Sequence, residues 1–128
     1  MPERRPPDDP TEWLNRARSN LALARMRAEE VYLEDLCFNL QQAAEKAIKA
    51  LLIKHGLPFP YVHDIGELLR LLEDAGQSVP VTLRQSVRLT RFAVFTRYPG
   101  VAPPISYDEY HEALMLAEAV VNWVAQQL

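Results

Sequence analysis

One segment near the middle of the chain constrains the fold most, because its apolar residues recur at helical spacing. Residues 40–52 read Leu-Gln-Gln-Ala-Ala-Glu-Lys-Ala-Ile-Lys-Ala-Leu-Leu. A step of about 100° per residue places seven apolar residues of this region in one broad sector: Leu36, Leu40, Ala43, Ala44, Ala47, Ile48 and Leu51. The pattern predicts a central helix that turns this sector to the core, and its alanines allow another helix to approach closely.

The other side of this central helix is polar. It carries Gln42, Glu45, Lys46 and Lys49, and its charges of opposite sign recur at the spacing of one helical turn. We expect a solvated face with spaced ion pairs.

Capping residues and helix breakers divide the chain into five predicted helices. Their expected spans are residues 9–30, 33–55, 64–75, 80–98 and 106–128. Asp9, Asp64 and Ser106 are the predicted N-caps, and Gly56 is the predicted stop after the central helix. No segment alternates as a strand would. The chain therefore predicts an all-α fold, an antiparallel up-and-down bundle of four to five helices.

Length and composition limit the domain organisation. A chain of 128 residues supports one hydrophobic core, and 48% hydrophobic with 24% charged residues is ordinary globular usage. We expect a flexible Pro-rich tail over residues 1–8 and a single helical domain over residues 9–128. No apolar run is long enough to cross a membrane and the amino terminus is charged, so we expect a cytoplasmic protein.

The fourth predicted helix has two unlike faces. With α-helical spacing, one face carries apolar residues that would turn to the core, Leu83, Val87, Val94 and Tyr98. The other is a basic stripe of Arg84, Arg88 and Arg91. Leu89, Phe92 and Phe95 fall on or beside the arginine side. Large apolar groups outside the core predict a self-association surface, so these three residues are the candidates for a dimer interface.

Few residues of the chain are candidates for catalysis or metal binding. The three histidines, His55, His63 and His111, have no second ligand at zinc spacing, so neither a metal site nor a metal cofactor is expected. The pair His63-Asp64 is typical of a capping aspartate beside a loop histidine. Cys37 is the only cysteine and falls in an apolar helical pattern, which predicts a buried structural thiol.

Three features of the chain resemble the HEPN family of small prokaryotic helical proteins: residues 40–52, the pair His63-Asp64 and the run Arg97-Tyr98-Pro99. The resemblance extends over residues 12–127. It implies a bundle of four or five helices, similar to the helical domain attached to aminoglycoside nucleotidyltransferases. Such proteins are usually dimeric and often encoded beside a minimal nucleotidyltransferase. The family's name reflects suspected nucleotide binding, so the resemblance also implies a nucleotide ligand.

The leading hypothesis is a non-catalytic binding module. In this interpretation a dimeric HEPN bundle engages a nucleotidyltransferase partner and contributes to a nucleotide or substrate pocket. Arg97, Lys46 and Lys49 are then the candidate phosphate contacts, and Tyr98 is available for stacking. The apolar residues of the fourth helix give a third hypothesis, a protein that only associates with itself.

The second hypothesis is an enzyme. Several HEPN branches are metal-independent ribonucleases that act as toxins of toxin–antitoxin pairs, and their motif is Arg-x4-6-His. Here the histidine after Arg97 is His111, fourteen residues on (111 − 97), so the motif is absent. A ribonuclease would therefore need Arg97 with an unconventional general base, His111 or His63, and the basic stripe could hold the RNA backbone. The missing motif favours a protein that is not an enzyme.

Overall fold

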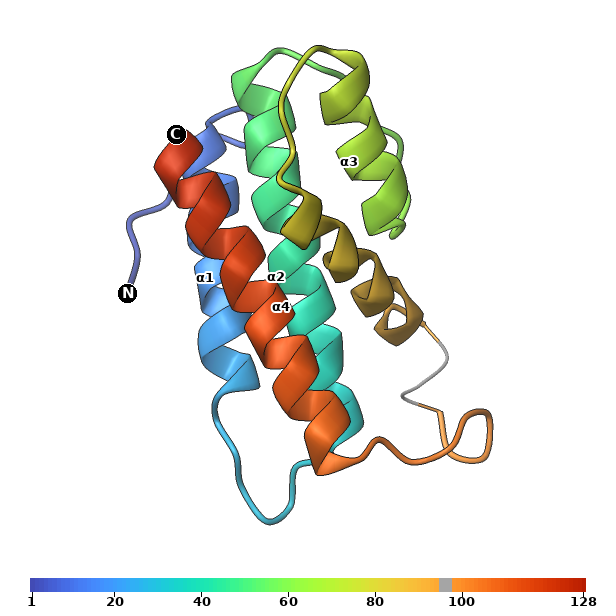
Figure 1. The fold of residues 1–128 in the computed structure, drawn as a ribbon. Coiled ribbons are helices and arrows are strands. Elements are labelled where there is room, and N and C mark those ends of the chain that lie inside the picture. Colours follow the sequence, from blue (N-terminus) through green and yellow to red (C-terminus); the bar gives the residue numbers. More distant parts are fainter. Residues whose placement is uncertain (95–97) are drawn as a thin grey trace.

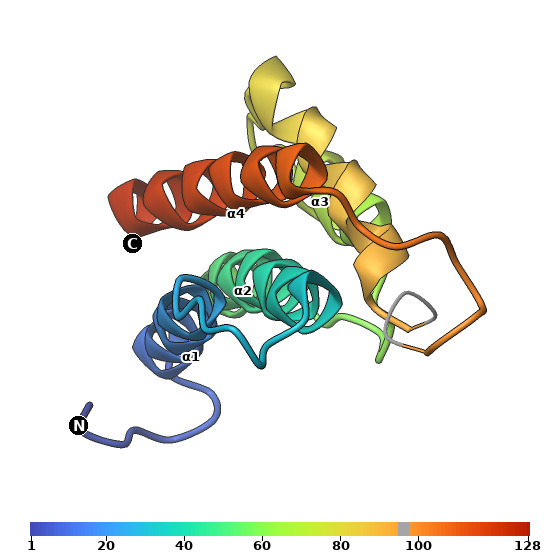
Figure 2. The same ribbon diagram turned by 90° about the horizontal axis from the view of Figure 1, so that it is seen from below.

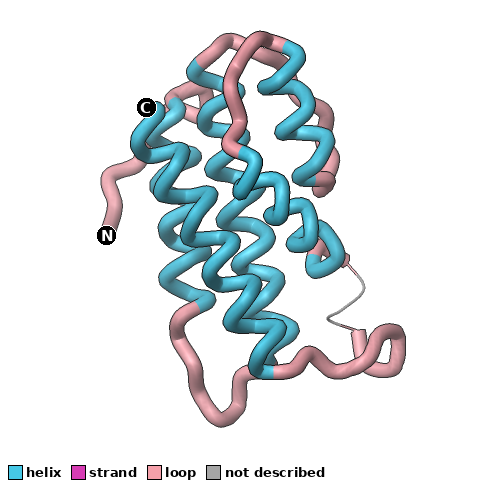
Figure 3. Tube along the Cα trace, viewed as in Figure 1, coloured by secondary structure: helices cyan, strands magenta, loops and turns pink. Residues whose placement is uncertain are grey.

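The computed structural model describes residues 1–94 and 98–128. Its elements are α1 (Pro10–Ala24), α2 (Leu33–Lys54), α3 (Ile65–Asp74), the 3-10 helix η1 (Val81–Phe92) and α4 (Tyr107–Gln127). Figures 1 and 3 show that the described part of the chain is helices and loops, without a strand. The predicted all-α class with five helices is confirmed.

Helix α2 is the centre of the bundle. It packs against α1, α4, α3 and η1, and Figure 2 shows it between α1 and α4. In Figure 1, α1 and η1 run in the opposite direction to α2, α3 and α4. The parallel order of α2 and α3 is possible because the loop of residues 55–64 is long enough to return along the bundle.

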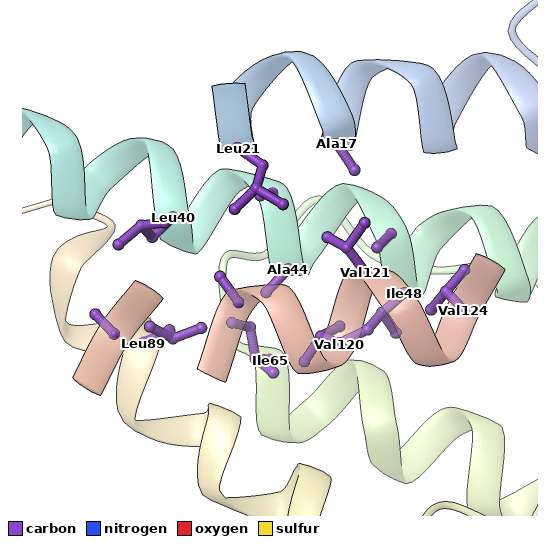
Figure 4. Close-up of a cluster of buried hydrophobic side chains, with 14 of the residues drawn as sticks. Ala17, Leu21, Leu40, Ala44, Ile48, Ile65, Leu89, Val120, Val121 and Val124 are labelled. Carbon is purple, nitrogen blue, oxygen red and sulfur yellow. The ribbon is translucent and has the colours of Figure 1, made fainter. Parts of the chain in front are cut away.

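The apolar sector of α2 forms the core, as predicted. All seven residues assigned to it from the sequence are buried, and Cys37 is buried beside them. Figure 4 shows Leu40, Ala44 and Ile48 among side chains from α1 and α4. Ala17 of α1 is also fully buried, so small side chains on both helices allow close packing.

The predicted N-caps are all present. The side chain of Asp9 accepts from the backbone N–H of Thr11, Asp64 accepts from that of Glu67, and Ser106 forms a reciprocal capping box with Glu109. Gly56 follows α2 with φ of 68°, the left-handed conformation that favours glycine.

Helix α1 ends at Ala24, earlier than the predicted residue 30. The hydroxyl of Tyr110 on α4 donates to the carbonyl of Ala24 at 2.7 Å. Residues 25–32 are all exposed. Because none of its side chains is buried in the bundle, this segment gains little from continuing the helix, since tertiary packing supplies most helical stability.

The buried and exposed faces of the fourth element differ from those predicted. It is a 3-10 helix, with about three residues per turn, so side chains three apart lie above one another. Its buried face carries residues at that spacing, Leu83, Ser86, Leu89 and Phe92. Val87, Val94 and Tyr98, which α-helical spacing assigned to the core with Leu83, are exposed. The prediction that Leu89 and Phe92 lie outside the core is therefore wrong, and Phe95 and Arg97 lie outside the described residues.

The basic stripe of η1 is neutralised within the chain. Arg84 pairs with Glu73 of α3, while Arg88 and Arg91 pair with Glu112 and Glu109 of α4. All three arginine side chains are more than half exposed, so each pair contributes little stability. The stripe joins η1 to α3 and α4.

The N-terminal segment makes contacts with α1. The indole N–H of Trp13 donates to the carbonyl of Pro7 at 2.7 Å, and the backbone N–H of Arg5 donates to Glu12 at 2.8 Å. The flexibility expected for residues 1–8 stays a prediction. Among the described helices, none has the length and hydrophobicity needed to cross a membrane.

Candidate functional site

A buried polar stripe runs along α2. Gln41, Glu45 and Lys49 lie four residues apart, and between 0% and 6% of each residue is exposed. The solvated face predicted for Glu45 and Lys49 is therefore wrong. The reason is tertiary: the loop after α2 brings Phe59 and His63 onto this stripe.

Glu45 is the centre of the polar network. Its Oε1 lies 2.8 Å from Nδ1 of His63 and accepts from the side-chain amide of Gln41 at 3.0 Å. Its Oε2 accepts from Nζ of Lys49 at 3.2 Å. The carboxylate thus has a cation and two polar partners, as a buried charge requires.

His63 is held by this network but reaches solvent. Its side chain is 57% exposed, whereas that of Glu45 is 4% exposed. The carbonyl of His63 lies 3.4 Å from Nε2 of Gln41, which is at the long end of a hydrogen bond. A carboxylate at Nδ1 fixes the orientation of the imidazole, and the exposed ring can exchange a proton with solvent. Asp64, its neighbour, is a helix cap, as predicted.

Lys49 lies beneath an aromatic pair. Its Nζ is 5.2 Å from the ring centre of Phe59 and 6.0 Å from that of Trp13, and the two rings meet edge to face at 5.9 Å. A cation over ring faces gains cation–π attraction. The structure therefore places Lys49, a predicted phosphate contact, in a buried pair with Glu45 and away from the surface.

Lys46 lies on the α1 side of α2. Its Nζ donates to the side-chain oxygen of Asn20 at 2.9 Å, and Asn20 in turn donates to Asn39. Lys46 is half-buried, and burial lowers the pKa of its ammonium.

Lys46 also lines a hollow of about 300 Å³ between the N-terminal segment and the two helices. The other lining residues are Arg5, Pro7, Glu12, Trp13 and Arg16. Glu12 accepts from Nε of Arg16 at 2.6 Å and from the backbone of Arg5. The bond from the Arg5 backbone, followed by that from Arg16, lowers the pKa of the Glu12 carboxyl, so it is a carboxylate at neutral pH.

The remaining predicted residues lie elsewhere. Tyr98 lines a second hollow of about 380 Å³ with Tyr32 and residues of the 98–106 segment. His111 is exposed on α4 with its ring 4.8 Å from that of Tyr107. Lys46 and Tyr98 thus line different hollows, and Arg97 is not described. No group of three or more His, Cys, Asp or Glu in residues 1–94 and 98–128 could hold a metal ion.

Sequence reasoning missed Gln41 and Trp13. Gln41, Glu45 and Lys49 follow one another at intervals of four, a spacing that places them on one helical face. That regular spacing was the available signal for a shared face, and it carries no information on whether the face is buried. Trp13 gave no such signal, because its role depends on contacts with Pro7 and Phe59.

The chain is similar to known HEPN proteins. Its sequence matches the HEPN domain model over residues 11–127. The solved structure of TT1696 from Thermus thermophilus is 34% identical, covers 93% of this chain and 98% of that chain, and has a TM-score of 0.81. ST0689, an archaeal HEPN homologue, is 30% identical over 93% of this chain and 97% of that chain, with a TM-score of 0.73. No curated protein matches.

Proposed function

The chain belongs to the HEPN family, and from that premise we propose a dimeric helical binding module that associates with a minimal nucleotidyltransferase and takes a nucleotide or related substrate. The observation that supports a binding module is an exposed apolar surface at one end of the bundle. Its large side chains come from the α1–α2 loop, the segment before α4 and the first turn of α4. We call it the loop-end surface: Met26, Val31, Tyr32, Tyr98, Val101 and Tyr107.

The segments of the loop-end surface lie together. Tyr32 and Tyr98 line the same hollow, as do Val31 and Tyr107 in a neighbouring one. The backbone N–H of Ile105 donates to Glu34 at 3.0 Å, which joins the segment before α4 to α2. Figure 1 shows both loops at the same end. Contiguous exposed apolar groups of this kind mark protein interaction sites.

A second copy of the chain is the occupant that we propose for this surface. A two-fold interface uses the same patch on both subunits, so the patch must be complementary to itself. The hollows of the loop-end surface are lined by Arg27 and Glu29 on one side and by Glu34 and Asp35 on the other. Both signs of charge are thus present around one apolar area.

Light scattering after size-exclusion chromatography tests the dimer. We expect a dimer of the wild-type chain, and a monomer for Tyr32→Ser combined with Val101→Ser, which removes apolar area from two segments. Val81→Ser is the matched control, because Val81 is exposed on η1 and outside the loop-end surface. A monomeric wild-type protein, or a dimer that the double variant leaves intact, contradicts the assignment.

The partner is tested by co-expression. When the chain is co-expressed with a minimal nucleotidyltransferase, the two proteins should elute together, and the tagged chain should retain that enzyme through a salt wash. Elution of the two proteins as separate species would contradict the association while leaving the homodimer unaffected.

A second candidate function, a metal-independent ribonuclease, is favoured by one contact. The buried carboxylate of Glu45 lies 2.8 Å from Nδ1 of the exposed His63, as expected for an oriented general base. Cleavage of a mixed RNA by purified protein with chelator present tests it. Loss of cleavage in both His63→Gln and Arg97→Ala would support the enzyme, whereas an inert wild type, or cleavage that both variants retain, would remove this candidate.

A further inference from the structure

We propose that the hollow around Trp13 and Lys46 is a binding site for a phosphorylated ligand that carries a flat aromatic ring, with a mononucleotide as the fitting class. The inference deepens the proposed function and rests on its nucleotide ligand. It names a site at the start of α1, whereas the loop-end surface follows the other end of that helix.

The charges of the hollow suit an anion. Three of its six lining residues are cations, Arg5, Arg16 and Lys46, and one is a carboxylate, Glu12. The carboxylate of Glu12 accepts a hydrogen bond from Nε of Arg16. That N–H is one of the five donors of a guanidinium. The Arg16 side chain is 57% exposed. Its other N–H groups are those that form paired hydrogen bonds to phosphate.

Lys46 would gain most from an anion. It is half-buried, and its hydrogen-bond partner is the neutral side chain of Asn20 at 2.9 Å. A partly desolvated ammonium without full charge compensation is costly, and a phosphate oxygen would supply that compensation. The lowered pKa of Lys46, caused by burial, agrees with this geometry.

Trp13 supplies the aromatic wall. Its indole N–H is already used by the carbonyl of Pro7, and Phe59 packs on it edge to face. These contacts fix the ring where it lines the hollow, and a fixed indole face is a stacking platform for a base. The volume of about 300 Å³ is at the lower end for small-molecule sites, which suits one nucleotide better than a dinucleotide.

Fluorescence of Trp13 provides a direct readout. The chain has two tryptophans, so Trp123→Phe leaves Trp13 as the only one. In this background we expect adenosine monophosphate to change the emission saturably, and adenosine or inorganic phosphate alone to bind more weakly. Lys46→Met and Arg16→Gln should each weaken binding about tenfold, the effect of losing one charge-assisted hydrogen bond.

Arg18→Gln is the matched control. Arg18 is an exposed arginine of the same helix that does not line the hollow, so its loss should leave the affinity unchanged. Far-ultraviolet circular dichroism of every variant checks folding. No saturable change up to millimolar nucleotide, or equal weakening by Arg18→Gln, overturns the site.

Light scattering on the same samples separates the two proposals. A dimer that binds no nucleotide contradicts the Trp13 site alone, and a monomer that binds nucleotide contradicts the loop-end interface alone. If Lys46→Met and Arg16→Gln both bind the nucleotide as tightly as the wild type does, the ligand binds outside the hollow and the inference is overturned.

Discussion

At the scale of single residues, Glu45 has the largest predicted effect on stability. It is buried with Lys49 at 3.2 Å, so Glu45→Gln leaves an ammonium in the core without its carboxylate. We expect a loss of about 3–5 kcal/mol in the free energy of unfolding, the range for breaking a buried pair. Urea unfolding measures it.

Two variants make this test specific. Glu67→Gln removes a carboxylate from an exposed pair with Arg70, which should change the free energy of unfolding far less, because exposed ion pairs contribute little stability. Glu45→Gln combined with Lys49→Met removes both charges and should recover part of the loss. Equal costs for Glu45→Gln and Glu67→Gln would show that the network contributes no more than a surface pair.

Cys37 gives a second prediction at this scale. It is fully buried, and burial raises the pKa of its thiol to about 12. Because the thiolate is the reactive form, the native protein at pH 8 should react with a thiol reagent at least about a hundredfold more slowly than the urea-unfolded chain. Absorbance with a disulfide reagent follows the reaction, and comparable rates in both states would contradict the buried position.

At the scale of elements, the three-residue period of η1 decides which side chains stabilise the fold. Leu89 is fully buried, whereas Val87 is 42% exposed. Leu89→Ala should therefore cost about 2–5 kcal/mol in the free energy of unfolding. Val87→Ala should cost no more than about 0.5 kcal/mol, as for ordinary surface changes. An α-helical register reverses this order, so urea unfolding of the two variants distinguishes the registers.

At the scale of the whole molecule, two carboxylates join separate parts of the chain. Glu12 holds the N-terminal segment on α1, and Glu109 pairs with Arg91 of η1. Hydrogen bonds from the Arg5 backbone to Glu12 and from the Ser106 backbone to Glu109 lower the pKa of each carboxyl. A carboxyl with a lowered pKa in the folded state stabilises the protein above its unfolded pKa, and that stability is lost as the pH falls through the folded value.

The free energy of unfolding should therefore fall as the pH drops below about 4, near the pKa of an unfolded glutamate. Glu12→Gln combined with Glu109→Gln should flatten that dependence, because neither amide titrates. Urea unfolding at several pH values between neutrality and pH 3 measures the slope. An unchanged slope in the double variant would contradict this origin of acid sensitivity.

The sequence by itself determined the helical class, the core face of α2 and the caps of three helices. These features are local, since helical periodicity and capping depend on residues within a few positions of one another. The role of Lys46 as a phosphate contact stays a prediction. The resemblance to the HEPN family, carried by residues 40–52, His63-Asp64 and Arg97-Tyr98-Pro99, is confirmed by the match over residues 11–127.

Only the tertiary structure decided which polar residues are buried and which faces are free. Glu45 and Lys49 carry the charges of a solvated helix, but the loop with Phe59 and His63 covers them. The burial of Leu89 follows from a 3-10 spacing that α-helical periodicity does not reveal. The hollow at Trp13 needs segments of α1, α2 and the N-terminus together. Such contacts depend on how distant segments pack, and no local pattern in the chain encodes them.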